Sequence, residues 1–133
     1  MSDSGTFPKR IFRIRVLTST FAVAQLEPDA PQPQWIRGEF VSCTRTSTET
    51  TIVCDASAVP SGVTCTAGWR CLHVDAVMDF SLVGVLASLC GTLAAASVGV
   101  FVCSTYDTDY ILVQQDQLAT ACEALSQAGH ELA

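Results

Sequence analysis

The sequence predicts an α+β protein in which helices cover one face of an antiparallel sheet. Most of the first half consists of short runs typical of strands, separated by prolines, glycines and polar turns. Two stretches in the second half instead carry apolar residues at helical spacing, and strand-like runs stand before, between and after them. From Arg70 onward the order is therefore strand, helix, strand, strand, helix and short strand, which is the ferredoxin-like βαββαβ arrangement.

The strands of the first half are predicted from the alternation of apolar and polar side chains and from the prolines, glycines and polar turns that bound each run. The first one alternates apolar and basic side chains: Phe12, Ile14 and Val16 with Arg13 and Arg15. A period of two gives a strand one apolar face and one solvated face. Further strands are expected at residues 21–26, 40–44, 50–54 and 69–78. The polar residues 45–49 join two of these runs in a hairpin, and Trp35 and Ile36 are expected to fold back as apolar anchors of a proline-rich loop.

Two helices are predicted in the second half. Leucines recur at spacings of four, three and four: Leu82, Leu86, Leu89 and Leu93. This stripe predicts a helix, and Ser81 stands where an N-cap is expected. A second stripe predicts a helix that begins near Asp116: Leu118, Ala121, Cys122, Leu125 and Ala128. Gly129 follows it as a left-handed C-terminal cap. The remaining strands are expected as a hairpin at 98–105 and 110–113 and a short edge strand at 130–133.

Composition excludes several classes of protein. The 133 residues include seven Lys and Arg against thirteen Asp and Glu, a formal charge of -6, with 49% hydrophobic and 15% charged residues. Such apolar content excludes a disordered acidic tail for most of the chain. The acidic balance argues against nucleic-acid binding, since that affinity comes mainly from neutralised phosphates.

Burial in the hydrophobic core is the expected role of both the cysteines and the long uncharged stretch. Seven cysteines form an odd set without a CxxC pair, so we expect small core residues, with no disulfide framework and no metal or other cofactor. Cys71, Cys90 and Cys103 lie in apolar runs and are expected to be inert thiols. The stretch from Phe80 to Tyr106 lacks charge and could span a bilayer as one helix. Its glycines and its β-branched end favour a buried helix followed by a buried strand, so no membrane association is expected. Since residues 1–8 carry no apolar signal core, the expected location is cytoplasmic.

The chain shows no constellation of nucleophile, base and oxyanion donors, so we do not expect an enzyme. His73 and His130 stand without ligands at metal-binding spacing and are expected to be structural. The basic cluster from Lys9 to Arg15 is either a solvated strand face or a contact for an acidic partner.

A candidate ligand site begins where the first helix is expected to start. Asp79, Phe80 and Ser81 lead into that helix, whose first backbone N–H groups lack internal partners and can hold a carboxylate. Gly84, next to Val85, would let a ligand approach the backbone closely. The alternative is that Ser81 only caps the helix and Gly84 only relieves a helix–sheet contact.

The second part of the candidate site is the adjacent hairpin turn. After Thr105, the sequence Asp107-Thr108-Asp109 offers two carboxylates that could bind an ammonium or guanidinium group. These residue types are also ordinary turn formers, which is the alternative explanation. Residues 71–133 hold seven acidic and no basic side chains, whereas residues 1–70 hold seven basic and six acidic ones. A zwitterion could therefore bridge the helix start and the acidic turn.

The order of elements and several motifs resemble the small tandem ACT-domain proteins. This family is related to the cytosolic arginine sensors of animals and, more distantly, to the regulatory end of aspartate kinases. The resemblance rests on residues 68–72 (GWRCL), 79–89 (DFSLVGVLASL), 104–113 (STYDTDYILV) and 128–130 (AGH), with support from Pro33-Gln34-Trp35, Arg45-Thr46 and Glu49. The sequence departs from the family pattern at Ser47, Thr48 and Thr50.

The resemblance implies two ACT-like units in tandem after a disordered tail at 1–10. The first, residues 11–68, would have degenerate helices, and the second, residues 69–133, the full pattern. It also implies a non-catalytic regulatory or sensor protein that binds a small effector, an amino acid, and forms a homodimer. The alternative is an interaction or dimerisation module without a small ligand.

Overall fold

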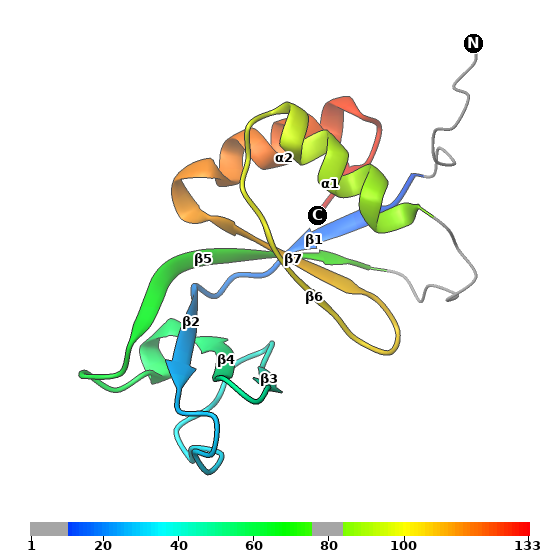
Figure 1. The fold of residues 1–133 in the computed structure, drawn as a ribbon. Helices are drawn as coiled ribbons and strands as arrows, with labels where there is room; N and C mark the ends of the chain where they lie inside the picture. The colour runs from blue at the N-terminus through cyan, green and yellow to red at the C-terminus, as the bar shows by residue number, and fades with distance from the viewer. Residues whose placement is uncertain (1–10, 76–83) are drawn as a thin grey trace. The chain divides into compact units, whose positions relative to one another are not determined.

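The computed structural model describes residues 11–75 and 84–133 (Figure 1). They divide into two compact units. One unit combines the described residues up to Leu17 with those from Leu72 to Ala133, and we call it the helical unit. The other, Thr18–Cys71, we call the strand unit. Strand β5, Cys65–Val74, contributes its first part to the strand unit and its last residues to the helical unit.

The helical unit is a mixed sheet with two helices on one face (Figure 1). Its elements besides β5 are β1 (Arg13–Val16), α1 (Val85–Ala95), β6 (Phe101–Ser104), β7 (Asp109–Gln114), α2 (Leu118–Gln127) and β8 (Glu131–Leu132). The strand order is β6-β7-β5-β1-β8. This confirms the predicted α+β fold, the two helices and the β6–β7 hairpin. The sheet is not wholly antiparallel as expected, because β8 runs parallel to β1.

Strand β1 belongs to the helical unit, which differs from the predicted division at residues 11–68 and 69–133. Ile14 pairs with Val74 of β5 and with Leu132 of β8, so β1 lies between these two strands. The Ile14 side chain is buried in the core beneath the helices. Burial of that apolar face against the helices holds β1 in this unit, although residues 18–71 follow it in sequence.

Both helices bury an apolar stripe, and in α1 the first buried position differs from the predicted one. In α1 the buried residues are Val85, Leu89 and Leu93, while Leu86 is only partly buried. Leu82 lies outside the described residues. In α2, Ala121 and Leu125 are fully buried, as the second stripe predicted.

From Gly84 onward, the uncharged stretch is a helix followed by a strand, as predicted. Helix α1 ends at Ala95, and Ser97 then adopts a left-handed φ of 62°, so the chain turns before β6 begins at Phe101. Within the described ranges, neither helix is both long and apolar enough to cross a membrane. After α2, Gly129 has a φ of 102°, which fits the predicted left-handed cap.

The strand unit is an antiparallel sheet in the order β3-β4-β2-β5. The remaining bounds are β2 at Phe21–Leu26, β3 at Ser42–Arg45, β4 at Thr50–Asp55 and a short 3₁₀ turn at Ala56–Ala58. The predicted β3–β4 hairpin is confirmed, with Thr44 opposite Thr51. One face carries a small core of Ala24, Ile52, Cys54 and Ala58, and the predicted anchors Trp35 and Ile36 pack against it.

Strand β5 starts earlier than the predicted Trp69 and contains an irregularity. Val23 pairs with Thr66 and Phe21 with Trp69, so β5 holds one extra residue across this interval. Gly68, within it, has a φ of 84°, a left-handed conformation that glycine adopts at little cost. The bulge accommodates the extra residue, so β5 pairs with β2 on both sides of it.

Candidate functional site

The hairpin-turn part of the predicted site lies at the end of the helical unit's sheet where β5 stops. The hydroxyl of Thr108 donates a hydrogen bond of 2.6 Å to the carbonyl oxygen of Val74, the last residue of β5. Thr108 is buried although it lies in a turn. In a βαββαβ order, the end of the first strand, the start of the first helix and the central hairpin turn share one edge of the sheet. The Thr108 hydrogen bond shows this arrangement directly for the strand end and the turn.

The start of α1 depends on a glycine. Gly84 is the N-cap, with a φ of 82° and no side-chain cap, and its carbonyl oxygen accepts the first helical hydrogen bond from Ser88 N at 2.8 Å. The left-handed φ explains why glycine stands here. The expected cap, Ser81, lies outside the described residues together with Asp79 and Phe80, and Gly84 occupies the cap position. Val85 is a core residue, so only its backbone can face a ligand.

The β6–β7 turn is held by its own threonines. Thr105 N donates to the carbonyl oxygen of Thr108 at 2.8 Å, and Thr108 N donates to the hydroxyl of Thr105 at 3.3 Å. The Thr105 hydroxyl in turn donates to the same carbonyl oxygen at 3.1 Å. Asp107, between them, is exposed to solvent. The turn is therefore well ordered, and it presents one solvated carboxylate.

Asp109 is in a different environment from Asp107. It is the first residue of β7, it is buried, and it accepts a hydrogen bond of 2.5 Å from the Ser104 hydroxyl of the facing strand. The charge of Asp109 also affects Cys90 in α1. Burial raises the pKa of the Cys90 thiol, and the nearby Asp109 carboxylate raises it further. The two carboxylates that the sequence placed together thus differ, since one is engaged in the sheet and only the other faces water.

The two histidines have structural surroundings, as predicted. The His130 ring stacks on Phe12 at 6.0 Å between centroids, and its Nδ1 accepts a hydrogen bond from Phe12 N at 3.1 Å. The His73 ring stacks on Tyr110 at 4.5 Å. Among the described residues, 11–75 and 84–133, no three His, Cys, Asp or Glu side chains lie close enough together to hold a metal ion. All seven cysteines are free thiols.

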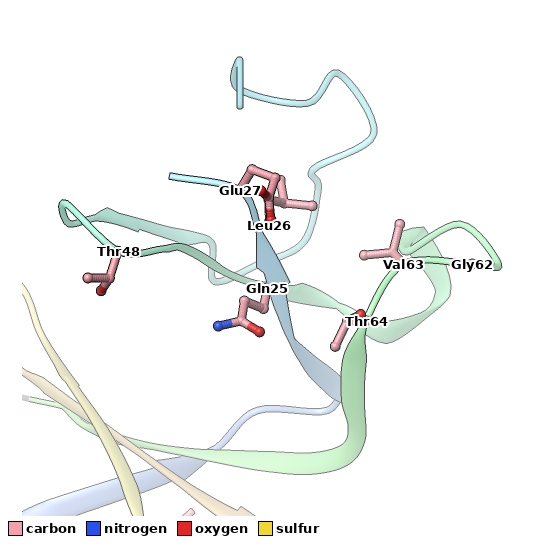
Figure 2. A pocket seen from close by; sticks show the side chains of 7 residues that line it. All are labelled: Gln25, Leu26, Glu27, Thr48, Gly62, Val63 and Thr64. Carbon is pink, nitrogen blue, oxygen red and sulfur yellow. The ribbon is translucent and has the colours of Figure 1, made fainter. Parts of the chain in front are cut away.

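A pocket in the strand unit was not predicted. We call it the β2-end pocket (Figure 2); its volume is about 400 Å³, and its lining residues are Gln25, Leu26, Glu27, Thr48, Gly62, Val63 and Thr64. They come from the end of β2, the β3–β4 turn and the segment before β5. No motif in the sequence marks them, because strand pairing alone brings these three segments together.

Comparisons with known proteins identify the family. A model of the ACT domain matches residues 64–127, from the start of β5 through α2, and a model described as an N-terminal domain matches residues 19–62. The solved structure of protein Atu0741 from Agobacterium tumefaciens is 32% identical, with a TM-score of 0.88 over 93% of each chain. This chain belongs to the ACT-domain family.

Other solved structures share the ACT-type fold at low sequence identity. Protein VC0802 from Vibrio cholerae is 17% identical with a TM-score of 0.74, over 88% of this chain and 89% of that one. The ligand-free regulatory subunit of aspartate kinase from Thermus thermophilus is 11% identical with a TM-score of 0.65, over 90% and 99% of the two chains. No curated protein matches this sequence. These two neighbours therefore share the fold of this chain.

Proposed function

We propose that this protein is a non-catalytic cytoplasmic regulator that binds a small effector, an amino acid, in its helical unit. The binding site would lie where β5 ends, α1 begins and the β6–β7 turn folds over. The hydrogen bond from Thr108 to Val74 is the observation that carries the proposal, because it holds the acidic turn at the strand end that leads toward α1. Membership of the ACT-domain family supports a regulatory role.

The chemistry of the described residues suits a zwitterion. The first N–H groups of α1 have no partners within the helix, and the helix dipole makes that end attractive to a carboxylate. Gly84 offers no side-chain cap that would compete for these groups. Asp107 is the exposed carboxylate that would bind the ammonium group. Asp79, Phe80 and Ser81 complete the proposed site on the strength of the sequence alone.

The test is a thermal-shift screen of the full chain against the common amino acids, purines and nucleotides. A ligand that binds only the folded state raises its stability by mass action, so one amino acid should raise the Tm. Asp107→Asn should abolish most of that rise. Asp116→Asn removes another exposed carboxylate from the same unit and should leave the rise intact. A rise that survives Asp107→Asn would remove the turn from the site.

The alternative is an interaction module without a small ligand, and the edge strand β6 favours it. Within the described strands, β6 pairs only with β7, and Val100 and Tyr106 on either side of it are exposed, Tyr106 at 83%. Unpaired strand edges readily pair with another chain. No thermal shift from any compound, together with a concentration-dependent mass in light scattering that Tyr106→Ser lowers, would support this function instead. A homodimer that forms independently of ligand is compatible with both functions.

A further inference from the structure

We propose that the β2-end pocket is a second binding site, for a small organic cation with a primary ammonium group on a short alkyl chain. The pocket lies entirely within the strand unit. The inference therefore does not depend on the effector site proposed for the helical unit.

Backbone hydrogen bonds hold the walls of the pocket in place. Gln25 N donates to the carbonyl oxygen of Thr64 at 2.9 Å, which ties the end of β2 to the segment before β5. In the β3–β4 turn, Thr46 N donates to the carbonyl oxygen of Glu49 at 2.8 Å, and Glu49 N donates to the Thr46 hydroxyl at 3.1 Å. Thr48 lies inside this closed turn. The lining segments are thus ordered before any ligand arrives, which lowers the entropy cost of binding.

Two polar side chains of the lining, Gln25 and Glu27, offer acceptors to a ligand. The side-chain nitrogen of Gln25 donates to Glu49 Oε1 at 3.3 Å, and Thr51 donates to the same oxygen at 3.0 Å. With its nitrogen engaged there, the Gln25 amide offers its oxygen to a ligand; Figure 2 shows the nitrogen on the Thr48 side and the oxygen on the Thr64 side. Glu27 adds an exposed carboxylate that forms no ion pair with any residue the structure describes.

Arg45, a basic residue near the pocket, already donates its hydrogen bonds to backbone carbonyl groups. The guanidinium of Arg45 donates to the carbonyl oxygens of Pro28 and Ala30, the loop that follows Glu27. No basic residue lines the pocket itself. A ligand ammonium group would therefore meet a carboxylate and neutral oxygens, whereas an anion would meet Glu27 without compensation. Charge-assisted hydrogen bonds of this kind are stronger than neutral ones.

The pocket also has an apolar part. Leu26 and Val63 line it, and both pack against the small core that contains Ala24 and Ile52. This surface is continuous with buried apolar side chains and would cover a short alkyl chain. The combination of acceptors with an apolar wall selects an alkyl ammonium over a bare metal ion.

The test is an amide-resolved NMR titration of the full chain with butylamine, which is protonated at neutral pH like a lysine side chain. Butanol and butyrate, with the same alkyl chain, are the neutral and anionic probes. Butylamine should shift the amides of Gln25, Thr48 and the segment Gly62 to Thr64, and the other two probes should not. Glu27→Gln should weaken binding about tenfold or more, since it removes the only lining charge.

Asp29→Asn is the matched control, because it removes a charge from an exposed residue two positions away. It should change the affinity less than about twofold, as expected for a screened surface charge. Three results would overturn the proposal: no shifts at millimolar butylamine, equal weakening by both variants, or shifts confined to the β6–β7 turn and the start of α1. The last result would leave the proposed effector site standing while removing this one.

Discussion

Thr108 donates its hydroxyl hydrogen to the carbonyl oxygen of Val74 across 2.6 Å, and the bond joins the β6–β7 turn to the last residue of β5. Both residues are buried. A buried carbonyl that loses its partner has no water to replace it, so the bond matters for stability as well as for the position of the turn.

Replacing Thr108 by the isosteric valine should lower the free energy of unfolding by about 1 to 2 kcal/mol, because it leaves the Val74 carbonyl unsatisfied. Urea unfolding at neutral pH measures the change. Thr120→Val makes the same substitution on the exposed side of α2 and should be nearly neutral. Equal losses in both variants would show that the hydrogen bond adds nothing.

Two glycine-to-alanine substitutions at α1 should change the stability of the protein in opposite directions. Gly84→Ala forces a φ of 82° on a residue with a Cβ and should destabilise the protein by about 1 to 2 kcal/mol. Gly91 lies in the helix interior, and a Cβ there meets nothing within 4 Å. Gly91→Ala should therefore stabilise by about 0.5 to 1 kcal/mol, through the higher helix propensity of alanine. Thermal unfolding of the two variants compares them, and the same sign for both would contradict the geometry of the helix start.

Acidification should destabilise the protein through His130. Burial lowers the pKa of this ring below its usual 6.5, and its Nδ1 must be unprotonated to accept the hydrogen bond from Phe12 N. Since the unfolded chain binds the proton more tightly, stability is complete above about pH 6.5 and falls as the pH drops below that value. His73 shifts in the same direction, by burial and the neighbouring Arg15.

The measurement is the Tm as a function of pH for the wild type and for His130→Asn, whose side-chain oxygen can replace Nδ1 as the acceptor. The variant should lose part of the slope below about pH 6.5 and keep the part that His73 supplies. An unchanged slope would exclude His130 as a source of the pH dependence.

The cysteines should react with an alkylating reagent in two classes. Cys43 and Cys65 are exposed, whereas Cys54 and Cys71 are buried, and burial raises the pKa of the Cys54 thiol. Because the thiolate is the reactive form, native protein should be labelled at the two exposed positions first. Mass spectrometry after brief labelling, with urea-unfolded protein as the control, gives the order. Early modification of Cys54 would contradict the described packing of the strand unit.

Much of the local structure could be predicted from the sequence because its signals are local. The alternation around Ile14 predicted β1, and the leucine spacing predicted α1 with an error of one helical position at its buried face. The left-handed φ at Gly129 matched its expected place after α2. Each of these signals depends only on residues within a turn or two along the chain.

The candidate site was less predictable, because burial and pairing decide what each polar group does. Asp107 and Asp109 look equivalent in sequence, yet the strand register puts Asp109 opposite Ser104 and engages its carboxylate. The lining of the β2-end pocket offers no local signal at all, since Gln25 and Thr64 come together only through the pairing of distant strands.

The sequence by itself therefore determined which segments are strands and helices, that a left-handed glycine ends α2, and that the chain is an ACT-type protein. Only the tertiary structure decided that β1 lies between β5 and β8, that Thr108 reaches Val74, and that the strand unit contains a pocket. The reason is physical: periodicity records which face of an element is apolar, whereas the partner of that face is chosen by long-range burial and hydrogen bonding over the whole chain.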